Sequence, residues 1–219
     1  MSIGGSAGRD SDTARIEAFS DGVFAIAITL LVIEIGVPHL EEGSGRTLFG
    51  ELVEQWPSYL GYVISFLQIG VIWANHHNRF RFIVRSDHVL LFLNILFLMC
   101  VAFIPFPTAL LADYLRGAER ATAGAVYAGT MAVNAVFFTL LWLYAATNYR
   151  LVDRILDPSL LRAMTRRYVL GTVAYLLAFL LAFVNVAASL ILLVVLALIF
   201  VLPEPGERPR PPRRAPARR

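Results

Sequence analysis

The hydrophobic positions of this chain gather into long runs, which are separated by short segments rich in arginine, acidic residues, proline and glycine. Apolar runs of about this length are typical of helices that cross a bilayer. The pattern predicts six such helices, over residues 15–37, 57–78, 88–111, 121–147, 168–183 and 187–202. The last two are near the lower length limit for a span. The expected fold class is an all-α membrane protein with six transmembrane helices per subunit.

Prolines and small residues indicate where these helices begin, bend or approach one another. Pro38 ends the first helix, and Pro57 suits the first turn of the second. Pro105 and Pro107 are expected to kink the third helix or to end its regular part. Close contact with a neighbouring helix is expected along the fourth, because it carries a cluster of small residues: Ala123, Gly124, Ala125, Ala128 and Gly129.

The first apolar run, from Arg15 to Val37, differs from a plain lipid anchor. It contains Ser20, Asp21 and Gly22 close to its start. An aspartate inside a hydrophobic span costs about 2.5–3.5 kcal/mol on insertion scales, so it needs a partner or a function. We therefore expect this helix to face other helices rather than lipid alone.

A helical projection divides this run into two faces. At about 100° per residue, one stripe is made of Ile26, Leu30 and Ile33, and Phe19 and Gly22 extend it toward the start of the helix. Thr29 lies at the edge of the stripe, and Asp21 points to the far side. The projection predicts that Asp21 faces neighbouring helices and that the stripe faces a pathway enclosed by copies of this helix.

A short motif joins this pattern to a known family. Arg15, Phe19, Ser20 and Asp21 form the motif RxxxFSD, which continues as GVFAIAITLLVIEI. This resembles the first helix of the endosomal and lysosomal potassium channel family (transmembrane protein 175) in its short bacterial and archaeal form. The six-span layout is similar too, except for the last residues. The resemblance implies a homotetramer of six-helix subunits with helix 1 lining a central pore. Family members lack the TVGYG filter loop, and this sequence has none.

The resemblance also implies roles for the stripe. Four copies of Ile26, Leu30 and Ile33 would form stacked apolar rings, the pore constriction, which ions pass only after shedding water. Thr29 would add a ring of hydroxyl groups that replaces part of the water around a cation, a contribution to selectivity. Whether Thr29 or the apolar rings dominate selectivity stays open. Because potassium sheds water more readily than sodium, the expected function is a leak-like potassium channel that prefers potassium over sodium.

The polar motif residues are expected to stabilise the fold. The resemblance implies a structural network made of Arg15, Phe19, Ser20, Asp21, Trp73 and His77. The depth of each residue in the predicted topology allows Asp21 to pair with His77, Asn75 or Arg79. A buried aspartate paired in this way fixes the orientation of its helix.

Composition narrows the classes that remain. Hydrophobic residues make up 58% of the 219 positions, which is typical of a polytopic membrane protein and not of a soluble domain. The single cysteine, Cys100, excludes an intrachain disulfide. The chain contains no lysine, which excludes a retinal Schiff base. We expect no cofactor and no bound metal; potassium is the permeant ion.

Arginines predict the orientation. Three follow the second span, five follow the fourth and six lie in the tail, whereas the opposite loops hold Arg46, Arg116 and Arg120 and most of the loop acids. The positive-inside rule then places both termini in the cytoplasm of a cell whose plasma membrane the chain spans. The predicted parts are a mobile N-terminus (1–14), a channel domain (15–202) and a disordered Pro/Arg-rich tail (203–219). The tail either contacts anionic headgroups or is simply solvated.

Two other classes of function, a transporter and an enzyme, have less support in the sequence than a channel. A proton- or cation-coupled secondary transporter would use Asp21 and His77 as titrating groups, but no internal repeat supports it. A Ser–His–Asp enzyme could be drawn from Ser20, Asp21 and the histidines, yet no nucleophile elbow is present. His76 and His77 point about 100° apart, so one helix cannot chelate a metal with both. The expected partners are further copies of the chain, membrane lipid and potassium ions, and not nucleic acid.

Overall fold

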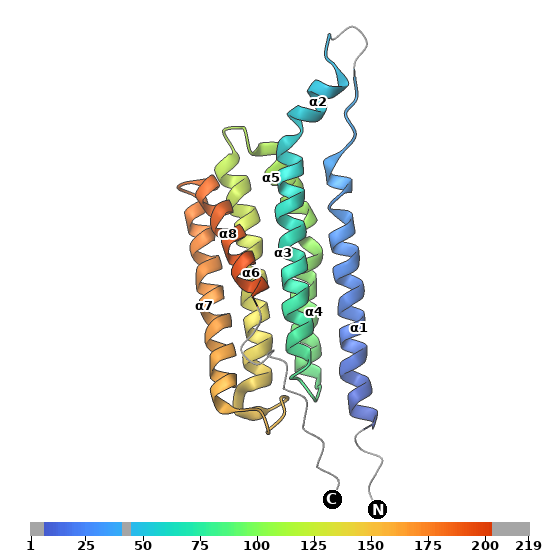
Figure 1. Cartoon of the computed structure of the whole chain (residues 1–219), viewed down its shortest axis with the longest axis vertical. Helices are drawn as coiled ribbons and strands as arrows, with labels where there is room; N and C mark the ends of the chain where they lie inside the picture. Colours follow the sequence, from blue (N-terminus) through green and yellow to red (C-terminus); the bar gives the residue numbers. More distant parts are fainter. Residues whose placement is uncertain (1–6, 41–44, 203–219) are drawn as a thin grey trace, which may run out of the picture.

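The computed structural model describes residues 7–40 and 45–202, with side chains described from Thr13 onward, and these residues fold almost entirely into helices. Figure 1 shows a bundle in which α1 forms one edge and α7 the opposite one. The elements follow one another in this order: α1 (Ala7–Leu30), η1 (Ile33–Ile35), α2 (Leu48–Glu54), α3 (Trp56–Phe80), α4 (His88–Phe103), α5 (Pro105–Tyr114), α6 (Arg120–Ala146), η2 (Thr147–Tyr149), α7 (Pro158–Ala182) and α8 (Val186–Val201).

Among the residues that the structure describes, five helical stretches are long and apolar enough to cross a membrane: Thr13–Ile35, Trp56–Phe80, His88–Tyr114, Arg120–Tyr149 and Pro158–Ala182. The sixth apolar helix, α8, has 16 residues. At ~1.5 Å per residue it is about 24 Å long, which is less than the ~30 Å hydrocarbon core. The helix ends part-way down the bundle (Figure 1). The all-α membrane class is therefore confirmed, and the predicted six spans correspond to five spans and one shorter apolar helix.

Two helices begin earlier than predicted. α1 starts at Ala7, inside the segment expected to be mobile, because residues 7–14 contain no proline that would stop a helix. α7 starts at Pro158, well before residue 168, because Asp157 accepts a hydrogen bond from the Ser159 backbone N–H and Pro158 occupies the first turn. The three arginines expected in a loop are therefore helical: Arg162, Arg166 and Arg167. The predicted tail, 203–219, lies outside the described residues.

The third span bends where its prolines predicted a bend. α4 ends at Phe103 and α5 begins at Pro105, with Ile104 between them. A proline inside a helix removes one N–H donor and clashes with the preceding turn, which explains the break. The predicted loop before the second span also contains the short helix α2, which Thr47 caps by accepting from the Gly50 N–H at 3.1 Å.

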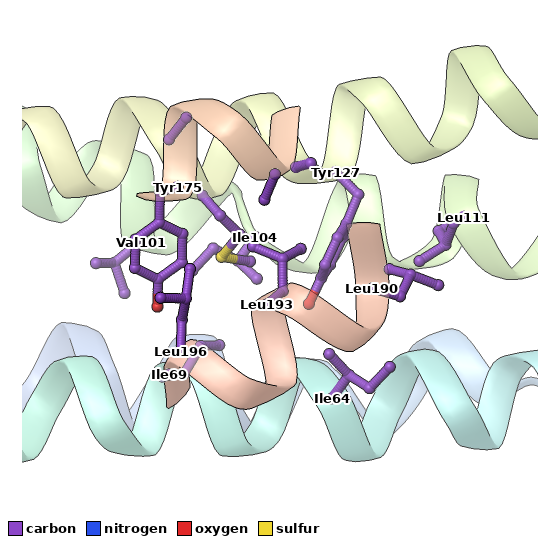
Figure 2. Close-up of a cluster of buried hydrophobic side chains, with 14 of the residues drawn as sticks. Ile64, Ile69, Val101, Ile104, Leu111, Tyr127, Tyr175, Leu190, Leu193 and Leu196 are labelled. Carbon is purple, nitrogen blue, oxygen red and sulfur yellow. The ribbon is translucent and has the colours of Figure 1, made fainter. Parts of the chain in front are cut away.

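The interior lies between α3, α4, α5, α6, α7 and α8, and α1 contributes Phe24 and Ala27 to it from one side. Figure 2 shows Leu190, Leu193 and Leu196 of α8 among side chains from the neighbouring helices. The small residues of α6 do allow close approach, as predicted. A Cβ atom added to Gly124 would lie 2.8 Å from Val186 Cγ1 of α8, and one added to Gly129 would lie 3.1 Å from the Phe179 ring of α7. In contrast, α1 packs on one side only, against α3 and α4.

Candidate functional site

The helix α1 has one face inside the subunit and one face outside it. Its buried residues recur every three or four positions at Ile16, Ser20, Phe24 and Ala27, and Leu31, directly after the helix, continues this spacing. The apolar residues of the predicted stripe lie on the other side, with exposed fractions of 62% for Phe19 and Ile26, 40% for Leu30 and 69% for Ile33. The stripe therefore points away from the helices of its own chain, and Ala27, which is 1% exposed, points toward them.

The outer end of the stripe is not part of one regular helix. α1 ends at Leu30, and a separate 3-10 turn starts at Ile33, so the prediction of a continuous helix to Val37 is wrong in its last turns. Gly36 has φ +65°, a left-handed backbone that suits glycine, and Pro38 follows it. The direction of Ile33 is therefore set by this turn and not by the helical period, although its side chain is exposed as expected.

Thr29 is exposed beside the stripe. Its hydroxyl donates back to its own helix, with Oγ1 at 2.9 Å from both the Ala25 and the Ile26 carbonyl oxygens. A hydroxyl has one hydrogen and two lone pairs, so this donation leaves the oxygen able to accept a hydrogen bond or to face a cation.

Two polar contacts join the first half of α1 to the last turns of α3. Asp21 Oδ1 accepts a hydrogen bond from Trp73 Nε1 at 2.8 Å, and His77 Nδ1 lies 2.6 Å from Glu17 Oε1. The Trp73 and His77 rings stack with centroids 6.1 Å apart. Residues four apart share a helix face, so antiparallel α1 and α3 place Asp21 opposite Trp73 and Glu17 opposite His77. The predicted depth allowed Asp21 to pair with His77, Asn75 or Arg79, but its hydrogen-bond partner in the structure is Trp73.

The other predicted partners of Asp21 lie elsewhere. Asn75 donates to the carbonyl oxygens of Val71 and Phe200, at 2.8 and 3.0 Å. Arg79 is fully buried, with its guanidinium carbon 3.4 Å from the centre of the Phe138 ring. Both side chains therefore face α6, α7 or α8 and not α1.

A second, fully internal network joins α1, α3 and α4. Asn94 Nδ2 donates to Ser20 Oγ at 3.0 Å, and Ser20 Oγ donates to the Ile16 carbonyl oxygen at 2.8 Å. Asn94 Oδ1 is 3.0 Å from His76 Nε2, so with the amide in this orientation the histidine donates through Nε2. The His76 ring stacks on Phe97, with centroids 5.4 Å apart. Three helices are thus tied together through buried polar groups.

Sequence reasoning missed two members of this network. His76 was considered only as a metal ligand or a catalytic base, and Asn94 was not considered. One signal was available, because Asn94 is the only polar residue that follows His88 in α4. A polar side chain in such a run needs a buried partner.

Two of the six residues of the predicted network belong to neither of these two groups of polar contacts. Phe19 is exposed, and Arg15 is exposed and makes no hydrogen bond or ion pair with the residues that the structure describes. The single chain therefore joins Asp21, Trp73 and His77 to one network and Ser20 to another. The roles of Arg15 and Phe19 stay predictions.

The residues from which a Ser–His–Asp triad or a histidine metal site could be drawn do not come together in the structure. Ser20 bonds to Asn94 and Ile16, whereas Asp21 bonds to Trp73, so these neighbours belong to different contacts. His76 and His77 contact different partners. Within ranges 7–40 and 45–202, no group of three or more His, Cys, Asp or Glu side chains could hold a metal ion.

Comparison with known proteins shows which family this chain belongs to. A family model described as "Endosomal/lysosomal potassium channel TMEM175" matches residues 15–105. A protein named as a potassium channel from Chamaesiphon minutus is 47% identical over 192 residues, which cover 88% of this chain and 95% of the relative. This chain belongs to the TMEM175 family.

The structural comparison agrees with the family. The crystal structure of a lysosomal potassium-selective channel TMEM175 homologue from Chamaesiphon minutus superposes with a TM-score of 0.80 at 46% identity, covering 87% of this chain and 97% of that one. A more distant relative of the TMEM175 family is named the endosomal/lysosomal proton channel TMEM175 of Gallus gallus. It is 37% identical over 106 residues, which are 46% of this chain and 21% of that protein.

Proposed function

We propose that this chain is a potassium-selective channel, assembled as a homotetramer with α1 lining the pore. The observation that carries the proposal is the exposed face of α1. Ile26, Leu30 and Ile33 are apolar side chains that stay 40–69% exposed within their own subunit. One helix cannot enclose a path, whereas four copies can. The family membership and the names of the close relatives support a potassium channel.

The proposed constriction works through dehydration. The stripe carries no acidic residue, so a cation at the rings meets a hydrophobic barrier and no compensating charge. The Thr29 hydroxyl oxygen, held by its donation to the α1 backbone, replaces part of the lost water. A barrier of this kind favours the ion that gives up water more readily, which is potassium.

The proposed orientation follows the charges. Arg79, Arg81 and Arg85 lie at the end of α3, and Arg150 and Arg154 lie between α6 and α7. The Asp21 and Glu17 contacts are near the same end, because α1 and α3 are antiparallel neighbours. We place this end in the cytoplasm and the chain in the plasma membrane.

The transporter alternative has less support. Its titrating groups, Asp21 and His77, are held by Trp73 and Glu17 near one end of the bundle. Coupling sites of secondary transporters lie near the middle of the bilayer. Proton conduction is the second candidate function, and the relative named as a proton channel favours it.

Single-channel recording tests the proposal. Purified protein in a planar bilayer should give unitary current steps, and under a potassium/sodium gradient the reversal potential should shift toward the potassium equilibrium value. A transporter would give no steps. Replacing both cations by large impermeant ones and applying a pH gradient tests proton conduction, since only protons could then carry current. Equal permeability to sodium and potassium would contradict potassium selectivity.

A further inference from the structure

A long apolar cleft lies between α3 and α8, on elements other than the exposed face of α1. Its volume is about 1080 Å³. Leu60, Val63 and Leu67 line it from α3, and Ile191, Val194 and Val195 line it from α8. Figure 2 shows Ile64 and Leu190, which also line the cleft, on these two helices. Val63 and Ile191 are 51% and 64% exposed, so the cleft is open toward the surroundings of the subunit.

One end of the cleft is polar. Among the described residues that line it, Arg120 at the start of α6 is the only charged one. Asn185, which caps α8, and Trp56 at the start of α3 lie at the same end. The Arg116 guanidinium covers the Trp56 ring at 5.3 Å. Tryptophan and arginine at the end of a span are typical of the level of lipid headgroups.

The length of the cleft fits one lipid leaflet. At ~1.5 Å per residue, the α3 wall from Trp56 to Leu67 extends about 16 Å. Half of a ~30 Å hydrocarbon core is about 15 Å. The apolar part of the cleft is therefore about as long as an acyl chain in one leaflet, and a positive charge lies at its headgroup end.

We propose that this cleft binds an anionic phospholipid, with an acyl chain between α3 and α8 and the phosphate beside Arg120. Positive charge at one end of an aliphatic cleft matches a molecule with one anionic head and an apolar tail. The N-terminal turn of α8 lies at the same end and adds a favourable partial positive charge. The proposal rests on the chain spanning a membrane and does not require ion conduction.

Trp56 reports on the cleft, because it lines the cleft beside Arg120. The intact chain is placed in phosphatidylcholine vesicles, and phosphatidylglycerol with brominated acyl chains is added in steps while tryptophan fluorescence is measured. Subtracting the quenching of Trp56→Phe isolates the signal of Trp56 from that of Trp73 and Trp142. We expect quenching that saturates at a low mole fraction of brominated phosphatidylglycerol, and quenching by brominated phosphatidylcholine that increases without saturation.

Two variants test the positive charge and the apolar part of the cleft separately. Arg120→Gln should raise the half-saturating mole fraction about fivefold, because one arginine near a charged surface contributes about that much. Val194→Phe narrows the apolar part of the cleft and should also raise the half-saturating mole fraction of brominated phosphatidylglycerol. Arg150→Gln is the matched control, since Arg150 lies at the opposite end of α6, over Tyr144. It should leave the half-saturating fraction unchanged.

Three outcomes would overturn the proposal. Equal, unsaturable quenching by both lipids would show that no anionic lipid is selected. Absence of quenching at Trp56 would show that protein covers the cleft, as a second copy of the chain would. If Arg120→Gln leaves the half-saturating mole fraction unchanged, Arg120 does not contact the lipid phosphate. Currents recorded from the same vesicles test conduction separately, so either proposal can fail without the other.

Discussion

At the scale of the residue, neighbouring motif positions have different partners. Ser20 and Asp21 follow one another, yet Ser20 bonds to Asn94 of α4 and Asp21 bonds to Trp73 of α3. Successive side chains on a helix point about 100° apart, so adjacent residues reach two neighbouring helices. The polar start of α1 thereby fixes the rotation of this helix, and with it the direction in which its apolar stripe points.

The pore proposal leads to a prediction for the stripe. Shortening a ring side chain should widen the path and leave more water around the ion, which hides the difference between potassium and sodium. Ile26→Ala and Leu30→Ala should raise conductance and lower potassium preference. A change of ~1 kcal/mol in the difference between the two ion barriers corresponds to about fivefold in the permeability ratio. Thr29→Ala should lower selectivity with a smaller gain in flux. Reversal potentials measure both effects.

Ile95→Ala is the matched control, because Ile95 is 55% exposed on α4 and the chemical change is the same. Ala27 does not serve this purpose, since it is buried against the subunit. Wild-type conductance and selectivity in both Ile26→Ala and Leu30→Ala would show that α1 does not form the constriction.

A second prediction concerns Asp21. Removing the carboxylate leaves the Trp73 indole N–H without its acceptor, and hydrogen bonds to charged groups contribute about 1.5–3 kcal/mol. Because the pair is partly exposed, Asp21→Ala should lower the free energy of unfolding by an amount at the low end of this range. Trp73→Phe should cost a similar amount and Asp21→Asn less, and the double variant should be less destabilised than the sum. Thermal unfolding in detergent measures this. An Asp21→Ala protein that assembles normally and differs only in ion preference would contradict the structural role.

At the scale of the element, close helix approach depends on single glycines. Adding a methyl group at Gly124 would place it 2.8 and 3.0 Å from the two γ-carbons of Val186, a stiff side chain at the start of α8. Gly124→Ala should therefore lower the free energy of unfolding by about 1–3 kcal/mol, although alanine favours helices. Gly70→Ala on α3 is the control, since nothing lies within 4 Å of the added atom. Equal stability of the two variants in a thermal shift assay would refute close packing here.

The start of α7 should depend on pH. The hydrogen bond from the Ser159 backbone N–H lowers the pKa of Asp157 below its ordinary value of 3.8. A carboxyl group whose pKa is lower in the folded protein contributes stability above its unfolded pKa, and this contribution disappears as the pH falls through the folded pKa. Asp157→Ala should therefore lower the melting temperature at pH 7, and the difference should shrink as the pH falls below about 4. A difference that stays constant down to pH 3 would contradict the capping role.

At the scale of the whole molecule, the exposed face of α1 leads to a prediction about assembly. α1 packs against α3 and α4 and exposes the remainder of its surface along the edge of the bundle (Figure 1). We predict a complex of four times the 24.3 kDa chain mass by native mass spectrometry. Ile26→Glu should weaken this complex, because four carboxylates would repel one another in an apolar ring. A stable monomer that still conducts ions would contradict the tetramer.

The sequence by itself determined features that depend on local periodicity and backbone chemistry. The apolar runs predicted a membrane-spanning helical chain, the 3.6-residue period predicted which side of α1 carries the stripe, and Pro105 predicted the break between α4 and α5. Each of these depends on residues close together in the chain. Tertiary structure alone decided the contacts between helices. The pairing of Asp21 with Trp73 and the joining of His76 to Asn94 depend on the depth and rotation of separate helices, which no local pattern contains. The same holds for the cleft that ends at Arg120, because its walls come from α3 and α8, which are far apart in the sequence.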